Sequence, residues 1–494
     1  MTSEKDQEKH VEDLNRDLVK NYGLGFRHVQ MLCMGICITV LFMARSSMAV
    51  AVLAMSDVKR KNDTNIVIYD WDPRTQNIIL SSFFWGYTTL QIPAGILSKK
   101  FGGKIILLFA LLANGVLCLL IPTLAALGGW PLVCMSRVAM GLTQACLFPA
   151  SHTLLGQWLP PNEQTSYSGI VYGGVQIGTI LSMPISGILA DTSMGWKSIF
   201  YTMSGLQFAV AIIWYFFTAS APREHKFISK EERIYIESRL NIKDTGTKLR
   251  IPWRVILTSK PLLATLLPHL GFASAFMIVF VDMPMYMESA LGISLKNSSV
   301  LSAFPYVGMW AAGFIAAIVS EKLCNTGILT RNACRKTFNS IGMFGVSTGL
   351  IILSFLGPRH ATFAVIALIG AMTLGGFTMA GFIVNQLDLS PNNAGIIMSL
   401  SNFISNIGAV SMTLAASAII GQDSTDVSRW RIVFLSNAVL CTAANVYYLI
   451  FGSTDRQEWD DPNYLDKKKA DPEETKPFKM QEKKEEKLNM DKTI

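Results

Sequence analysis

The chain has 494 residues, of which 50% are hydrophobic and only 16% carry a charge, and its mean hydropathy is +0.35. This composition is too apolar for a soluble domain and is typical of a protein that crosses a membrane many times. The net charge of +8 is concentrated in polar segments outside the apolar ones, so it does not indicate nucleic-acid binding.

Apolar segments of spanning length recur between two polar tails, residues 1–28 and 453–494. About 20 apolar residues cross the hydrocarbon core as a helix, so the sequence predicts an all-α membrane protein with twelve transmembrane helices. A basic linker, 221–260, separates two six-helix halves, 29–220 and 261–452. The predicted helices are 29–56, 75–97, 104–126, 130–156, 166–191, 198–220, 261–287, 298–320, 337–356, 361–387, 394–420 and 431–452.

The loops differ in their content of Lys and Arg. With both tails in the cytosol, the cytosolic tails and loops hold 32 of the 43 basic residues and the outer loops hold nine. Cytosolic loops carry an excess of Lys and Arg, so we expect cytosolic termini. The glycosylation sequons at Asn62 and Asn297 both fall in predicted outer loops, which supports this orientation.

The remaining two basic residues lie inside predicted helices: Arg45 in helix one, within "LFMARSSMAVAVLAM", and Arg137 in helix four. A cation at the centre of a bilayer costs about 3 kcal/mol on insertion scales, and a guanidinium cannot lose its charge. One interpretation is an intramembrane salt bridge. The alternative is that a bound anion supplies the counter-charge. Acids in or near the spans are few, and none is placed to pair with both arginines: Asp191, Asp282, Glu288 and Asp388.

Helical spacing places further polar and aromatic side chains on shared faces. We expect these faces to line a cavity, although aromatic stripes also pack against neighbouring helices and polar groups also join helices to one another. The faces are Arg137, Gly141, Gln144, Phe148 and Ser151 or His152 in helix four; Phe83, Tyr87 and Gln91 in helix two; and Ser399, Asn402 and Asn406 in helix eleven.

Several segments resemble a known family. The loop "GILSKKFGGK" resembles the Gly-x-Leu-x-Asp-Arg-x-Gly-Arg loop of the major facilitator superfamily, with Lys99 where that loop has its acid. "DWDPRTQNIILSSFFWGYTTLQIPAG", "PPNEQ", "MPISGILAD", "GWKSIFY", "IPWRVILTSKP" and "GFIVNQLDLSPNNAGIIMSLSN" are similar to the anion transporters that include vesicular glutamate transporters, sialin and type I sodium-phosphate cotransporters. The resemblance extends from about residue 26 to residue 462.

The resemblance implies secondary active transport by alternating access, in which two halves rock around a central site. It implies that Arg45 and Arg137 bind a small anionic substrate and that Tyr87 lies in the same cavity. We expect a monomer in a lipid bilayer, with no cofactor or firm metal site and no nucleic-acid partner. The loop between helices two and three is expected to gate the halves through Gly95, Lys99, Gly102 and Lys104.

Departures from the family concern the coupling ion. Gln144 stands where proton-coupled relatives have a glutamate, and Leu80 and Phe272 stand where vesicular glutamate transporters have a histidine and an arginine. An amide cannot titrate, so we expect sodium rather than a proton as the coupling ion, with phosphate or a monovalent organic anion as cargo. The helix-eleven oxygens are weak candidates for sodium ligands. His152, His269 and Asp282 are alternative proton carriers, although a single histidine in an apolar helix is more often structural.

Other classes fit less well. The sequence contains no His-Glu-x-x-His motif and no phosphate-binding glycine loop, so we do not expect an enzyme. A proton-coupled symporter of acidic sugars or carboxylates and an uncoupled anion uniporter or channel remain alternatives. We expect the plasma membrane rather than a lysosomal or vesicular one.

Overall fold

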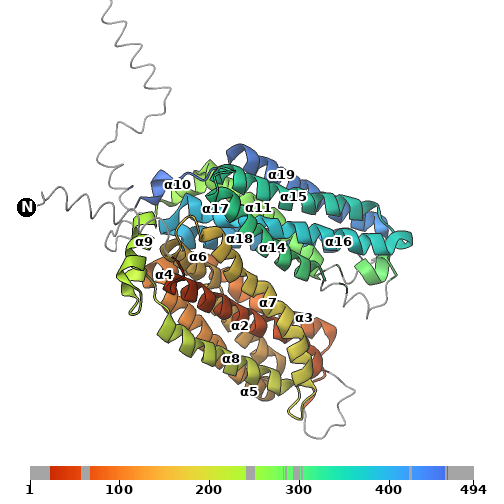
Figure 1. Cartoon of the computed structure of the whole chain (residues 1–494). Helices are drawn as coiled ribbons and strands as arrows, with labels where there is room; N and C mark the ends of the chain where they lie inside the picture. The colour runs from red at the N-terminus through yellow and green to blue at the C-terminus, as the bar shows by residue number, and fades with distance from the viewer. Residues whose placement is uncertain are drawn as a thin grey trace, which may run out of the picture.

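The computed structural model of the chain describes residues 23–56, 67–240, 251–281, 283, 286–292, 301, 304–421, 425–461 and 464 (Figure 1). Within these ranges it is helical and contains no strand. The first bundle comprises α2 (Phe26–Met55), α3 (Pro73–Thr89), α4 (Gln91–Phe101), α5 (Gly103–Gln144), α6 (Leu147–Trp158), α7 (Gln164–Ala190) and α8 (Trp196–Phe217). The linker contains η2 (Pro222–Glu224), α9 (Lys230–Leu240) and α10 (Trp253–Thr258). The second bundle comprises α11 (Lys260–Val281), η3 (Tyr286–Ala290), α14 (Phe304–Asn325), α15 (Arg331–Phe355), η4 (Pro358–His360), α16 (Ala361–Gly375), η5 (Gly376–Ala380), α17 (Phe382–Leu389), η6 (Pro391–Asn393), α18 (Ala394–Ile420) and α19 (Val427–Phe451), and η7 (Glu458–Asp460) follows it.

The helices agree with the twelve predicted spans. In the described part of the chain, ten helices are long and apolar enough to cross a membrane, and the 56-residue stretch Gly103–Trp158 contains two of the predicted spans. These two are separated at Gly128 and Gly129, whose backbone angles are not helical. The remaining span, helix two, is divided at Leu90 into α3 and α4. Pro93 explains this division, because it lacks the amide hydrogen that would bond to the carbonyl four residues earlier. The predicted fold class is confirmed.

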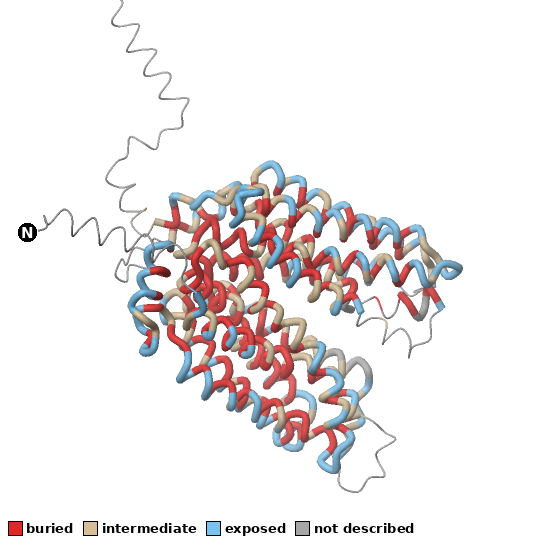
Figure 2. The backbone as a smooth tube through the Cα atoms, viewed as in Figure 1, coloured by how far each residue is buried: buried red, intermediate tan, exposed pale blue. Residues whose placement is uncertain are grey.

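The outer surface of the bundles differs from that of a soluble protein. Large apolar side chains on the outside of the bundles are exposed, such as Ile105 and Phe109 of α5 at 58% and 59%. Polar side chains lie inside, and Gln91, Gln144 and Asn339 are fully buried. Buried residues accordingly line the inner faces of both bundles (Figure 2). Lipid is the solvent that suits such an outer surface.

The two bundles meet through small residues. α7 packs against α14, and α18 packs against α4 and α6. A methyl group added at Gly95 would collide with Ser399, and one added at Gly156 would lie 2.8 Å from the carbonyl oxygen of Pro391. These contacts lie at the end of the molecule that carries α9 and α10, which we call the linker end, and the bundles diverge from there (Figure 1).

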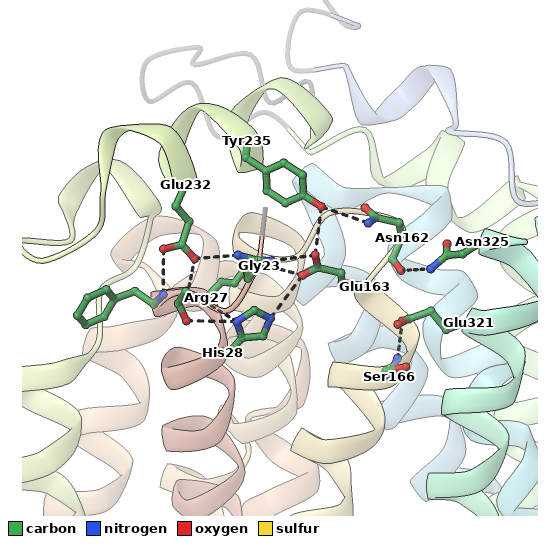
Figure 3. Close-up of polar contacts among 12 residues, drawn as sticks. Gly23, Arg27, His28, Asn162, Glu163, Ser166, Glu232, Tyr235, Glu321 and Asn325 are labelled. Atoms are coloured by element: carbon green, nitrogen blue, oxygen red, sulfur yellow. Dashed lines mark hydrogen bonds and ion pairs between the residues drawn. The ribbon is translucent and has the colours of Figure 1, made fainter. Parts of the chain in front are cut away.

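The linker end is held by a polar network centred on Arg27 (Figure 3). Its guanidinium donates to Glu163 at 2.7 Å and to Glu232 of α9 at 3.1 Å. Glu232 also accepts the backbone N–H groups of Phe26 and Arg27, at 2.9 and 3.0 Å. A carboxylate at a helix N-terminus stabilises that end, which explains why α2 begins at Phe26, inside the segment expected to be a polar tail.

Two further hydrogen bonds join the bundles at the linker end (Figure 3). The Asn325 side chain of α14 donates to the carbonyl of Asn162 at 2.8 Å, and the backbone N–H of Ser166 in α7 donates to Glu321 of α14 at 2.8 Å. Together with the glycine contacts, these bonds close the linker end of this structure.

Candidate functional site

Arg45 of α2 lies among four aromatic rings. Its guanidinium carbon is 4.6 Å from the centroid of the Phe83 ring and between 4.9 and 5.2 Å from those of Phe84, Phe42 and Tyr87. Three of these rings belong to α3, which spaces Phe83 and Tyr87 one turn apart so that the two rings stack at 5.8 Å. Cation–π contacts of this kind hold a cation without neutralising it.

Arg137 of α5 contacts the same ring as Arg45. Its guanidinium carbon is 4.9 Å from the Phe83 centroid, and its side chain is only 3% exposed. The approach of α5 to α3 depends on Gly86 and Gly141, because a methyl group at either would collide with a backbone carbonyl of the other helix. Gly141 therefore lets Arg137, one turn earlier, reach the Phe83 ring.

The arginine pair has no acidic partner in the part of the chain that the structure describes. Neither Arg45 nor Arg137 forms an ion pair there, and the Nε and Nη1 atoms of Arg137 are buried without a hydrogen-bond partner. Asp388, one of the acids considered above, pairs with Arg335 at 2.8 Å instead. Asp282 and the side chain of Glu288 lie outside the described residues, as do Asn62 and Asn297. Buried donors and uncompensated cations are costly, so this cluster is suited to receive an anion.

Arg335 lies in a helix that begins earlier than expected. Helix nine was expected to begin at 337, which left Arg45 and Arg137 as the basic residues within the spans, but α15 begins at Arg331. Arg335 is therefore a further buried arginine, 1% exposed, and its Nη1 donates to Thr165 of α7 at 2.8 Å. The hydropathy pattern missed it because three basic residues at the start of α15 resemble a loop.

Gln144 is buried at the crossing of α2 and α5. Its amide nitrogen donates to Asn114 Oδ1 at 3.0 Å and to the carbonyl of Leu41 at 3.4 Å, whereas its own oxygen has no hydrogen-bond partner in the described structure. Asn114 also donates to Thr143 at 2.6 Å. The position thus holds a neutral amide network on the same helix as Arg137.

His152 of α6 joins the two halves. Nδ1 contacts the Tyr172 hydroxyl of α7, and Nε2 lies 3.4 Å from the carbonyl of Ile383 in α17. His269 of α11 also contacts α17: its ring packs on Phe382, and its Nδ1 is 2.6 Å from Ser401 Oγ. Both histidines are hydrogen-bonded, which matches the structural role that is more common for histidines in apolar helices.

The helix-eleven residues are spread along α18. Ser399 is buried against Gly95 of α4, and its hydroxyl donates to the carbonyl of Ile396 at 2.7 Å. Asn402 has a buried Nδ2 without a partner in the described structure, and its carbonyl accepts from Asn406 at 2.9 Å. Ser399 therefore belongs to the contact between the halves, whereas Asn402 retains an unused polar group.

The loop between helices two and three divides into two roles. Gly95 and Lys99 face the second bundle: Gly95 packs on α18, and Lys99 Nζ donates to Asn393 Oδ1 at 2.6 Å. Gly102 has φ of 79°, a conformation that glycine adopts readily, and it turns the chain between α4 and α5. Lys104 donates to the carbonyl of Tyr215 at 2.9 Å, inside the first bundle.

Sequence reasoning missed several residues of these clusters. Phe42 and Phe84 complete the rings around Arg45, and Asn114 is the partner of Gln144. Periodicity within one helix cannot reveal contacts between helices. The spacing of Phe42 one turn before Arg45 was the available signal.

Two bundles of helices long enough to span a membrane meet at one end, and an arginine pair is buried inside the first bundle; this is the architecture of a membrane transporter. The chain belongs to the Major Facilitator Superfamily, whose family model matches residues 34–413. It is 36% identical over 405 residues to a Drosophila melanogaster protein named "Putative inorganic phosphate cotransporter", with 81% of this chain and 76% of that protein covered. It is 34% identical to human sialin, with 79% and 78% covered, and 28% identical to vesicular glutamate transporter 1 of Bos taurus, with 91% and 81% covered.

Solved structures show the same fold at low sequence identity. The proton:xylose symporter XylE superposes with a TM-score of 0.64 at 12% identity, covering 86% of this chain and 97% of its own. The transporter FucP in the outward conformation superposes with a TM-score of 0.57 at 13% identity, covering 85% and 99%.

Proposed function

We propose that this chain is a secondary active transporter that carries a small anion across a membrane by alternating access between its two halves. The observation that carries this proposal is the arrangement of Arg45 and Arg137 on one ring, that of Phe83, without an acid beside them in the described structure. Two guanidinium groups held close together repel one another, and an anion between them removes this repulsion.

The cargo that we propose is inorganic phosphate or a monovalent organic anion. The names of the relatives support an anionic cargo, since they include an inorganic phosphate cotransporter, sialin and vesicular glutamate transporters. Phe272 of α11, which contacts Phe276, stands where the family resemblance has an arginine in vesicular glutamate transporters, so this position offers no cation to the second anionic group of a dicarboxylate. A singly charged group fits the arginine pair better.

Sodium is the coupling ion that we propose. Gln144 cannot change its protonation state, and its hydrogen bonds to Asn114 and Leu41 give it a structural role. A proton-coupled symporter of acidic sugars or carboxylates is the second candidate, favoured by the contact of His152 with the second bundle through Ile383. We also propose cytosolic termini, a monomeric protein and a location in the plasma membrane.

The experiment is uptake of labelled phosphate and of a panel of labelled organic monoanions into proteoliposomes, with sodium, pH and voltage gradients imposed separately. We expect accumulation above the external concentration that requires sodium. Arg45→Gln and Arg137→Gln are each expected to reduce uptake at least about 100-fold, because a charge-assisted pair is removed from a desolvated site.

Arg233→Gln is the matched control, since Arg233 is an exposed arginine of α9 that pairs only with Glu237 along its own helix in the described structure. Wild-type uptake by both site variants would refute the anion site. An unchanged rate after sodium is replaced by choline would refute sodium coupling, and a dependence on the pH gradient in its place would select the proton-coupled alternative. Flow that stops at equal concentrations would identify a uniporter or channel.

A further inference from the structure

The segment that follows the last helix packs back onto the linker end. It was expected to be part of a solvated tail, but Trp459 and Asp460 are only 4% and 1% exposed. Trp459 packs in an apolar cluster with Ile256 of α10, Leu262 of α11 and Ile397 of α18. The backbone N–H of Gln457 also donates to the carbonyl of Leu389 at 2.9 Å.

Asp460 binds the loop between α17 and α18. One carboxylate oxygen accepts hydrogen bonds from the Ser390 hydroxyl, from the backbone N–H of Asn392 at 3.1 Å and from the Asn393 side chain at 3.0 Å. The other accepts from Arg456 at 2.7 Å. A carboxylate with so many donors fixes the loop in one conformation.

The same loop is the part of the second bundle that Lys99 reaches. Because the Asn393 nitrogen donates to Asp460, the Asn393 oxygen faces the other way and accepts from Lys99 of the first bundle at 2.6 Å. Asp460 is therefore a positioning residue for a contact between the halves. Burial lowers the pKa of Lys99, and the negative charge of Asp460 opposes that shift.

Without a nearby acid, the positive charge of Lys99 beside Asn393 would be unfavourable. Asn393 is the N-cap of α18, and the N-terminus of a helix carries partial positive charge that disfavours a nearby cation. The loop between helices two and three has Lys99 where the resembling loop of the family has an acid. Asp460 brings a negative charge to this position from a distant part of the chain.

We propose that the segment from Arg456 to Asp461 is a latch that holds the linker end closed, with Asp460 supplying the carboxylate that position 99 lacks. Opening the linker end must break the bond between Lys99 and Asn393, and Asp460 strengthens that bond by orienting the Asn393 amide. The latch rests on the movement of the two halves and not on the identity of the carried anion.

The experiment measures the distance between probes at Glu224 and Ile328, introduced as noncanonical amino acids so that native cysteines stay unlabelled. Both positions are exposed at the linker end, one before α9 and one in the turn after α14. In the purified full chain, Asp460→Asn is expected to raise the ratio of open to closed linker ends about tenfold, the value of a lost charge-assisted hydrogen bond. Asp455→Asn is the matched control, because Asp455 is exposed, precedes the latch and bonds to Ser453 beside it.

Two variants separate latching from a purely structural role. Lys99→Met removes the bond between the halves while leaving Asp460 and its loop intact, and it should give the same shift even if Asp460→Asn does not fold. Lys99→Asp in the Asp460→Asn background returns an acid to position 99 and should restore the closed state. Distance distributions of Lys99→Met that match the wild type would overturn the proposal, as would failure of the restored acid to close the linker end. No substrate is needed, so this outcome is independent of the anion assay.

Discussion

The Phe83 ring gives the sharpest test of the arginine cluster, because it is shared by two cations that come from different helices. Arg45 lies 4.6 Å and Arg137 4.9 Å from its centroid, whereas the neighbouring Phe84 contacts Arg45 alone among the described cation–ring pairs, at 4.9 Å. Phe83→Leu keeps an apolar side chain but removes both cation–π contacts. Phe84→Leu removes one and serves as the matched control.

The magnitude follows from the number of contacts. A cation–π contact in a partly desolvated site contributes about 1 kcal/mol, which corresponds to about fivefold in an equilibrium constant. Phe83→Leu should therefore raise the KM of anion uptake by about 25-fold, because each of the two guanidinium groups loses one such contact. Phe84→Leu should raise it by about fivefold. In both variants the maximal rate should change less than KM, since the contacts orient groups that bind the anion.

Initial rates of anion uptake into proteoliposomes, measured over a range of anion concentrations, give KM and maximal rate separately. Thermal unfolding in detergent checks that both variants fold, and a Leu in place of Phe should lower their melting temperatures similarly. Equal KM values for the two variants would refute the reasoning, because the shared ring would then have no special role. A loss of maximal rate at constant KM would show that Phe83 acts on the movement of the halves instead.

Two further predictions concern the linker end. Arg335→Met leaves Asp388 buried without its 2.8 Å partner and should destabilise the fold by about 3–5 kcal/mol. Thermal unfolding should show that stability recovers when Asp388→Leu is added. Arg331 is partly exposed and lies 3.8 Å from the same acid, so Arg331→Gln should lower stability little. Burial raises the pKa of Asp460 despite Lys99 and Arg456 nearby. Opening removes Lys99 and its attraction but leaves Asp460 buried in its own bundle, so the carboxyl binds a proton more tightly in the open state. Lowering the pH through the raised pKa should therefore increase the open fraction in the distance assay, in the same direction as Asp460→Asn. An equal pH dependence in Asp460→Asn would contradict this assignment.

The sequence predicted the fold because the bilayer imposes a length on every span. Twenty or so apolar residues between polar loops are visible without any knowledge of tertiary contacts, and the predicted helix bounds fall within a few residues of those observed for α2, α7 and α18. The error at α15 has the same origin. Arg331 and Arg335 pair with Asp388, and Lys336 donates to the carbonyl of Leu449; hydropathy detects neither kind of contact.

The site was predictable only as far as a single helix determines it. The spacing of Arg137, Gly141 and Gln144 correctly placed all three inside, because a helix repeats every 3.6 residues. The ring shared by Arg45 and Arg137 required the crossing of α3 and α5, which two glycines determine from different helices. The role of Asp460 was still harder to predict, since a charged tail composition gives no sign that one acid is bound by Ser390 and Asn393.

The two clusters place opposite demands on the same molecule. At the arginine site, cations are left without acids in the described structure, so that binding energy is available for an anion. At the linker end, Arg27, Lys99 and Arg335 are all hydrogen-bonded. The bonds of Lys99 to Asn393 and of Arg335 to Thr165 join the two bundles, which the proposed alternating access would separate. Charges whose partners break apart during the cycle must each contribute little, because a strong closed state would slow every opening. The Asn393 amide, which lies between Lys99 and Asp460, meets this requirement. Asp460 orients the amide, while the bond between the halves stays weaker than a direct ion pair.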